Sequence, residues 1–245
     1  INTFWMYLFA GSLGLLLLAL FFQRKTRKEN KRLSDDKERL RMEVQVLKAQ
    51  QKLGQLQLNP HFLFNTLNSI NGLIALGENK KARKALNTFS QMMRAVLENS
   101  KKDAISIEDE KLFLEKYLAL EKLIRDDMFD YEIGIENVSA KIAPMIIQPF
   151  LENAIIHGLK HKEGKGQLKI NIKNKGTYIN VIIEDDGIGR TAAKKFKSEG
   201  HESSAIKITQ DRLKSMDKWK QEEHLSYEDL TDPTGTIVIL NIPKQ

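Results

Sequence analysis

Residues 59–68 read Asn-Pro-His-Phe-Leu-Phe-Asn-Thr-Leu-Asn, so that a histidine, His61, directly follows a proline. Leucine and isoleucine recur at helical spacing over residues 53–74, and this stripe predicts a helix that runs through the motif. A proline inside a helix removes a backbone donor and kinks the helix. Taken alone, His61 is interpreted as a partly buried helix residue, and a chemical role for it needs support from elsewhere in the chain.

The stripe stops at Gly-Glu-Asn, residues 77–79, and a second apolar stripe runs over residues 82–99. Two helices joined by so short a break predict an antiparallel hairpin. A third helix is expected to start at Ser106, because its hydroxyl and Asp109 three residues later form a capping box, and to end near Arg125.

The chain of 245 residues carries a net charge of +7 and has no cysteine. Disulfides, thiolate metal sites and a catalytic cysteine are therefore excluded. A positive chain suggests nucleic acid or an anionic membrane as a partner. Six lysines and arginines lie between Arg24 and Arg32, directly after an apolar run, so a membrane is favoured and direct nucleic-acid binding is not expected.

The apolar run, residues 4–22, contains one clearly polar side chain, that of Ser12. At about 1.5 Å per residue it would be roughly 28 Å long as a helix, close to the hydrocarbon core of a bilayer. The basic cluster that follows marks the cytoplasmic side, whereas in a signal peptide the basic residues come first. We predict a single transmembrane helix at residues 1–23, with the C-terminal part of the chain in the cytoplasm.

Residues 24–48 are expected to form a basic linker that includes a short parallel coiled coil. Leu33, Leu40 and Leu47 recur every seven residues, and Val44 lies four after Leu40, which is the spacing of a coiled-coil seam. So short a repeat is marginal, and a solvated amphipathic helix is the alternative interpretation.

The period of the apolar pattern changes after residue 129. Helical spacing predicts helices at residues 144–159 and 206–219, and the polar, lysine-rich residues 191–204 are expected to form a loop or mobile lid. Alternation predicts strands at residues 131–135, 168–172, 179–183 and 236–242. Strand pairs alternating with helices imply an α+β sandwich in which helices cover one face of the sheet.

Polar side chains interrupt the apolar helix at residues 144–159. Glu152, Asn153 and His157 are the interruptions, and Asn153 and His157 share a face because they are four residues apart. An asparagine carbonyl is a hard oxygen ligand suited to Mg²⁺. A helix cap or surface amide is the equally weighted alternative for Asn153.

A second group of candidate residues follows the strand at residues 179–183. There Asp185-Asp186-Gly187-Ile188-Gly189 sets a carboxylate beside two glycines that let the backbone pass close to a ligand. Taken alone this pattern is more typical of a tight turn. Gly235-Thr236, which opens the last strand, is uninformative by itself.

In this order, His61 on a hairpin, Glu152-Asn153 on a helix, Asp185-x-Gly187-x-Gly189 and Gly235-Thr236 resemble a sensor histidine kinase of a two-component system. More narrowly, the strings N-P-H-F-L-F-N and E-N-A-x-x-H-G resemble the LytS/YehU-type family, which has a GHKL-type ATPase domain. The resemblance covers residues 50–243. It implies an α-helical dimerisation and histidine phosphotransfer hairpin domain at 49–128 and an ATP-binding α+β sandwich at 129–245. These follow the transmembrane helix at 1–23 and the linker at 24–48 that the residues themselves predict.

The resemblance also implies an activity and partners. A membrane-bound kinase of this type uses ATP and Mg²⁺ to phosphorylate its own motif histidine and passes the phosphoryl group to an aspartate of a cytoplasmic response regulator. Regulators with LytTR-type DNA-binding domains commonly accompany the family. The resemblance implies a homodimer in the bacterial cytoplasmic (inner) membrane, crossed once by this chain.

Individual roles follow from the same resemblance. His61 would accept the γ-phosphoryl group on an imidazole nitrogen, and Asn153 would hold Mg²⁺ between the phosphates. Asp185 would accept a hydrogen bond from the adenine amino group, with Thr236 beside it. The remaining implied contacts are room for the nucleotide at Gly187 and Gly189, and a ribose or phosphate contact at His157.

Asn65 lies one turn after His61 and shares its face. In other histidine kinases a threonine or asparagine at this offset positions the water that dephosphorylates the regulator. The resemblance implies such a phosphatase role for Asn65, and a helix-surface amide is an equally weighted alternative.

Two departures from the pattern bear on activity. Pro149 occupies the place where related ATPases carry a glutamate that activates water, which favours transfer to histidine over hydrolysis. Ser203 and Ala205 replace the glycines of a second motif before Arg212-Leu213, so the lid geometry is expected to differ. The alternative function is a catalytically weak adaptor that signals through dimer contacts. Three lysines lie in the expected lid: Lys194, Lys195 and Lys197. We interpret them as solvated, because a run of charges is more often solvated than bound to phosphate.

Overall fold

The structure is a computed structural model, and it describes residues 23–31, 33–37, 40–42, 44, 60–99, 102–136, 139–196, 204–216 and 224–245. The chain divides into two compact units, Ile1–Leu56 and Gln57–Gln245. The transmembrane helix predicted at residues 1–23 lies, except for Gln23, outside the described residues. Within the described part of the chain, no helix combines the length and the apolar character needed to cross a membrane.

The described residues of the first unit are helical, as predicted for the linker. Three apolar side chains of the heptad pattern point into solvent here: Leu33 is 66% exposed, Leu40 61% and Val44 40%. Leu47 lies outside the described residues. The helix is therefore confirmed where it is described, and the coiled coil stays a prediction.

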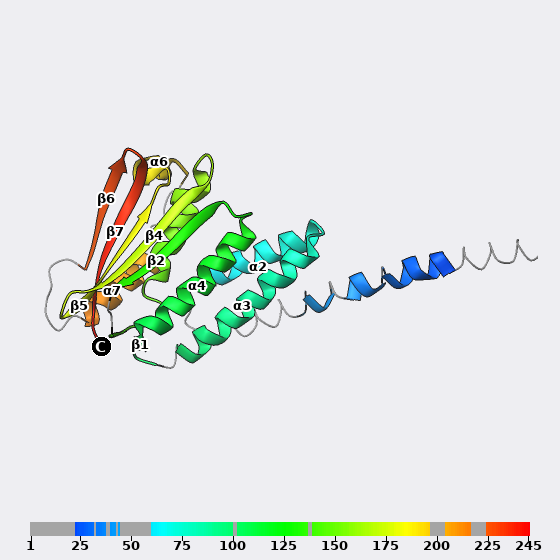
Figure 1. The fold of residues 1–245 in the computed structure, drawn as a ribbon, viewed down its shortest axis with the longest axis horizontal. Helices are drawn as coiled ribbons and strands as arrows, with labels where there is room; N and C mark the ends of the chain where they lie inside the picture. Colours follow the sequence, from blue (N-terminus) through cyan, green and yellow to red (C-terminus); the bar gives the residue numbers. More distant parts are fainter. Residues whose placement is uncertain are drawn as a thin grey trace, which may run out of the picture. The chain divides into compact units, whose positions relative to one another are not determined.

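The second unit begins with the predicted helical hairpin (Figure 1), made of α2 (Pro60–Ala75) and α3 (Asn79–Asn99). The proline occupies the first helical position, where a missing N–H costs nothing, and the kink stays a prediction because residues 45–59 are not described. Gly77 has φ +77°, and the N–H groups of Gly77 and Glu78 donate to the carbonyls of Ile74 and Leu73. This Schellman motif ends α2 and turns the chain into α3.

The third predicted helix is α4 (Ile107–Ile124), and it packs against both α2 and α3. The Ser106 hydroxyl accepts the backbone N–H of Asp109 at 3.0 Å, so the predicted cap is confirmed. Two successive residues with positive φ, Asp126 at +53° and Asp127 at +62°, form the turn that follows α4.

The remaining residues form the predicted α+β sandwich. Its five-stranded sheet has the order β2-β4-β5-β7-β6, with β2 parallel to β4 and every other pair antiparallel. The strands are β2 (Phe129–Glu136), β4 (Gly166–Asn174), β5 (Tyr178–Asp185), β6 (Leu225–Thr231) and β7 (Thr234–Pro243). Apolar side chains alternate along the central strands and are buried on one face, among them Ile170, Val181 and Leu240.

Helices on that buried face carry the polar motifs of the chain. After α5 (Gln148–Asn153) come a π-helical segment (Ala154–Gly158) and a short 3-10 turn (Leu159–His161). The helix predicted at residues 144–159 thus starts later than expected. The helix α7 (Ser204–Met216) agrees with its prediction.

Three features depart from the sequence predictions. The strand β6 was not predicted, and neither was the small sheet in which β1 (Ile105–Ser106) pairs with β3 (Lys141–Ile142). The expected loop or lid at residues 191–204 begins with helical turns, α6 (Gly189–Ala193) and the 3-10 turn Lys194–Phe196. The prediction of a loop is therefore wrong for residues 191–196, because their backbone forms these helical turns. The alternative, a mobile lid, stays a prediction.

Candidate active site

Asp185 is the last residue of β5, and its carboxyl group is almost completely buried. It lies opposite Thr236 of β7 in the strand register, as the resemblance implies, and Thr236 is buried as well. Its Oδ1 accepts the backbone N–H of Gly187 at 3.0 Å. Burial raises the pKa of Asp185 to about 7, and the carboxylates of Asp186 and Glu184 act in the same direction.

Glycines allow three segments to close around Asp185. A Cβ atom added to Gly158 would lie 2.6 Å from Asp185 Oδ1, and one added to Gly235 would overlap the Asp185 carbonyl. A Cβ on Gly187 would overlap the backbone of Gly158. The close approach of these backbones is enough to require glycine at the three positions, without any demand for space from a nucleotide. Gly158, although part of a motif, was not predicted as a site residue.

Gly189 was predicted to give room to a ligand, and its backbone explains the glycine in another way. It has φ +74°, a region that side-chain-bearing residues rarely adopt, and it starts α6. The preceding residue, Ile188, donates its N–H to the carbonyl of Gly158 at 3.3 Å. The end of β5 and the π-helical segment are therefore held together at this point.

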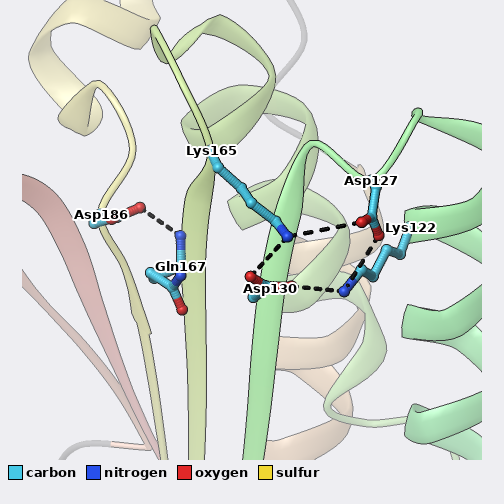
Figure 2. Close-up of polar contacts among 6 residues, drawn as sticks. All are labelled: Lys122, Asp127, Asp130, Lys165, Gln167 and Asp186. Atoms are coloured by element: carbon cyan, nitrogen blue, oxygen red, sulfur yellow. Dashed lines mark hydrogen bonds and ion pairs between the residues drawn. The ribbon is translucent and has the colours of Figure 1, made fainter.

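The neighbouring aspartates have different environments. Asp186 Oδ2 pairs with Lys162 at 2.5 Å. Its Oδ1 accepts the backbone N–H of Gln167 at 2.7 Å, as Figure 2 shows. Asp186 thereby ties the loop after β5 to β4. Asp185 points instead toward Gly158, so it is the carboxylate that faces the candidate site.

Asn153, the predicted Mg²⁺ ligand, is the last residue of α5 and is half-buried. The π-helical turn that follows contains His157, also half-buried, and ends at Gly158 beside Asp185. Single π-helical turns within helices occur frequently at functional sites. This turn connects the Asn153 helix to the Asp185 carboxylate, so the sequence motifs around residues 153, 185 and 236 meet in one region.

Among the described residues, no group of three or more histidine, aspartate or glutamate side chains could hold a metal ion. A Mg²⁺ ion that binds mainly through nucleotide phosphates and water needs only one or two protein oxygens. The amide oxygen of Asn153 is of the type such an ion accepts. Lys197 and Ser203 lie outside the described residues, and the effect of the lid substitutions stays a prediction.

His61 is the second residue of α2, and Asn65 follows one turn later and is half-buried. Between them, Phe62 and Leu63 are buried, while Phe64 is 50% exposed. The structure therefore gathers the nucleotide-site candidates around Gly158 and places His61 and Asn65 on a different element, the first helix of the hairpin.

Two aromatic contacts near the site were not predicted. The ring of His161, to which no role was assigned, stacks on Phe196 with centroids 4.3 Å apart and planes 8° apart. Arg190 of α6 lies over the Tyr227 ring of β6 at 4.5 Å. Both contacts fasten the helical turns that follow β5 to neighbouring elements, and neither has a signal in local sequence.

Residues 49–129 match the protein family described as Histidine kinase. The sensor protein LytS of Streptococcus mutans is 36% identical over 143 residues, covering 58% of this chain and 24% of that protein. LytS of Staphylococcus saprophyticus is 31% identical over 204 residues, covering 80% of this chain and 34% of that protein. The sensor histidine kinase YpdA of Escherichia coli is 34% identical over 144 residues, covering 58% of this chain and 25% of that protein.

The chain thus spans about a quarter to a third of the length of these relatives. Among solved structures, the catalytic domain of histidine kinase ThkA is similar with a TM-score of 0.40 and 19% identity, covering 58% of this chain and 95% of that chain. A mycobacterial sensor histidine kinase, MprB, is similar with a TM-score of 0.41 and 14% identity, covering 58% of this chain and 97% of that chain.

Proposed function

This chain belongs to the histidine kinase family, and on that premise we propose that it is the kinase portion of a membrane-bound sensor. In this proposal it phosphorylates His61 with ATP and Mg²⁺ and passes the phosphoryl group to an aspartate of a cytoplasmic response regulator. The regulator is of the LytTR type, and the membrane is the bacterial cytoplasmic membrane.

The observation that carries the proposal is the environment of Asp185. A buried carboxylate with one backbone donor on Oδ1 can accept a hydrogen bond from the exocyclic amino group of adenine. Thr236 beside it adds a hydroxyl that can donate or accept. Because the glycines at 158, 187 and 235 close the surrounding backbone, the carboxylate is held in a fixed position before a ligand arrives.

The proposed reaction is an in-line displacement. A neutral imidazole nitrogen of His61 forms a bond to the γ-phosphorus as the bond to the β,γ-bridging oxygen breaks, ADP leaves, and the imidazolium loses its proton to solvent. The Asn153 amide oxygen would help to hold a Mg²⁺ ion, which would supply positive charge where negative charge develops on the phosphates. Pro149 cannot act as a base toward water, so transfer to His61 is favoured over hydrolysis.

A homodimer is part of this proposal. The exposed stripe of Leu33, Leu40 and Val44 supports it, since an apolar seam at heptad spacing is buried by pairing with a second helix. The hairpin of α2 and α3 is the proposed phosphotransfer element. Asn65, one turn from His61, is proposed to position the water that removes the phosphoryl group from the regulator.

A second candidate is a catalytically weak adaptor that signals through dimer contacts. Ser203 and Ala205 in place of lid glycines favour it, because such residues restrict the left-handed conformations available to the lid. The two candidates differ in whether Asp185 binds nucleotide.

The test is labelling of the purified chain with γ-labelled ATP. His61→Gln is expected to abolish acid-labile label and leave ATP binding intact, whereas Asn65→Ala is expected to keep the label. Labelling of His61→Gln at the wild-type level would contradict the phosphoacceptor assignment. ATP binding that does not depend on Asp185, measured by titration of Asp185→Asn, would favour the adaptor.

A further inference from the structure

Arg190 is the second residue of α6, and its guanidinium lies over the Tyr227 ring of β6, 4.5 Å from the ring centroid. Its Nη1 lies 3.8 Å from Oδ2 of Asp229, which belongs to the same strand. The Arg190 side chain is still 47% exposed. The two contacts therefore hold the guanidinium in place without covering it.

The strand register places these partners beside the candidate site. Asp229 lies opposite Thr236 of β7, and Thr236 lies opposite Asp185 of β5. Opposite residues of antiparallel strands point to the same face of a sheet, so the three side chains form a row about 10 Å long, which is two strand spacings. Tyr227, two residues before Asp229, points to the same face.

The backbone brings Arg190 to the same place. A Cβ atom on Gly189, the preceding residue, would lie 3.7 Å from the carbonyl oxygen of Gly235, which directly precedes Thr236. The helix α6 also contacts β6, β7 and the π-helical segment that ends at Gly158. Arg190 therefore lies at the rim of the site in which Asp185 is proposed to bind adenine.

The chemistry of a guanidinium suits this location. The group is flat and weakly hydrated, and it stacks on aromatic rings. One side of the Arg190 guanidinium rests on Tyr227, and the side turned away from that ring can receive a second ring. Bases stack on guanidinium planes in the same way. A hydrogen bond at Asp185 would hold only the edge of a base, so the faces of the base are left for another group.

We propose that Arg190 contacts the nucleotide base: its guanidinium, backed by the Tyr227 ring, stacks on one face of the adenine whose amino group donates to Asp185. The inference rests on the proposed function, because it concerns the same nucleotide site. It divides base recognition between an edge contact at Asp185 and a face contact at Arg190. The ordinary interpretation is that Arg190 only fastens α6 to β6.

The two interpretations differ in which ligands a variant loses. Titration calorimetry of the whole chain with Mg²⁺ compares ATP, ADP and tripolyphosphate, which carries phosphates and no base. Arg190→Ala is expected to weaken ATP and ADP binding by the same factor, about tenfold, as for the loss of one stacking contact with a base. Tripolyphosphate binding and the melting temperature of the nucleotide-free protein are expected to stay at the wild-type values.

Two further variants sharpen the test. Arg190→Lys keeps the positive charge and loses the flat group, so it is expected to lose nearly as much ATP affinity as Arg190→Ala. Lys195→Ala is the matched control: it removes an exposed cation from the 3-10 turn that follows α6, and it is expected to bind all three ligands like the wild type.

Wild-type ATP affinity in Arg190→Ala overturns the inference alone. Wild-type ATP affinity in Arg190→Lys also overturns it, because the charge would then be sufficient. Weaker tripolyphosphate binding in Arg190→Ala overturns it as well, since that result indicates a phosphate contact or, with a lowered melting temperature, a structural role. Absence of ATP binding to the wild-type chain overturns the proposed function and this inference with it.

Discussion

The α-carbon of Gly158 faces the carboxylate of Asp185 so closely that a Cβ atom at residue 158 would stand 2.6 Å from Asp185 Oδ1. The π-helical turn and the end of β5 therefore fit each other only through a glycine. Gly158, which ends the π-helical segment after Asn153, thus fixes the position of the Asp185 carboxylate, which is proposed to recognise adenine.

Gly158→Ala is expected to displace the Asp185 carboxylate and lower ATP affinity by about tenfold or more, because one methyl group must occupy the place of an oxygen. Titration calorimetry measures the change. Gly72→Ala is the matched control, since nothing lies within 4 Å of the position where its Cβ would be. Unchanged affinity for Gly158→Ala would show that Asp185 does not contact the nucleotide.

ATP affinity is expected to fall several-fold as the pH decreases from about 8 to about 6. The pKa of Asp185 is raised to about 7, mainly by burial, so its carboxyl group takes up a proton over this range and becomes a weaker acceptor for the adenine amino group. Binding measured at several pH values tests this. Asp185→Asn serves as the reference, because it keeps the titration of the ATP phosphates and removes that of residue 185; equal pH dependence in both proteins would contradict the prediction.

Stability is expected to decrease as the pH rises from about 4.5 to about 7. Burial raises the pKa of Glu110 from 4.5 to about 7, against backbone hydrogen bonds, including one from Met145 at 3.0 Å, and the charge of Arg212. A group with a raised pKa binds its proton more tightly in the folded state. Its contribution to stability is therefore complete at pH values below its pKa in the unfolded chain, and it is lost as the pH rises through its pKa in the folded protein. Its size is at most about 3 kcal/mol.

Urea denaturation of wild type and Glu110→Gln at several pH values measures this contribution. The variant keeps an oxygen acceptor for Met145 and does not titrate, so its free energy of unfolding should change less between the two ends of the range. Asp185 contributes a slope of the same sign, and Asp185→Asn provides its control. A slope for Glu110→Gln as steep as that of the wild type would assign the pH dependence to other groups.

Arg212 of α7 donates from Nη1 to the carbonyl of Pro144 at 3.0 Å and lies near Glu110. Arg212→Met is expected to lower the free energy of unfolding by about 1–2 kcal/mol through the lost hydrogen bond. It should also raise the pKa of Glu110 further, because the positive charge of Arg212 lowers that pKa. Urea denaturation at several pH values measures both effects, with exposed Lys214→Met of the same helix as control. Equal free energies of unfolding for the two variants would contradict the role of Arg212.

Four charged side chains join α4, the turn after it, β2 and Lys165, which directly precedes β4 (Figure 2). Asp130 accepts from Lys122 at 2.6 Å and pairs with Lys165 at 2.8 Å, and hydrogen bonds from these lysines lower its pKa. Asp130→Asn leaves Asp127 as the one carboxylate of the four that still pairs with the two lysines. A small loss of stability is therefore expected at low salt, and it disappears at high salt. Denaturation at both ionic strengths measures it, with exposed Glu132→Gln of the same strand as control. A loss that persists at high salt would point to packing.

Sequence periodicity predicted the hairpin, α4 and its cap, because local signals decide these elements: Ser106 caps α4 and Gly77 ends α2. The strand β6 was not predicted, because this edge strand contains Ser226, Glu228 and Asp229 and has too few apolar residues to show an alternating pattern. The π-helical turn has no period that an apolar stripe can reveal.

The same distinction between local signals and tertiary contacts applies to the individual polar residues. Asp185 and Thr236 were predicted because they occur in motifs, and the strand register pairs them. The buried Glu110 was missed since its partner lies on another segment; Met145 is 35 residues from Glu110 in the chain. Burial of a polar group by tertiary contacts leaves no mark on local sequence.

The short pairing of β1 with β3 has a consequence for dissecting the protein. Ile105 lies opposite Ile142, and the backbone N–H of Gln245 donates to the carbonyl of Lys141. The strand before α4 is thereby part of the same folded layer as the end of the chain. A nucleotide-binding fragment cut at residue 129 would lose β1 and with it one side of this pairing, whereas a fragment that begins ahead of Ile105 keeps both strands.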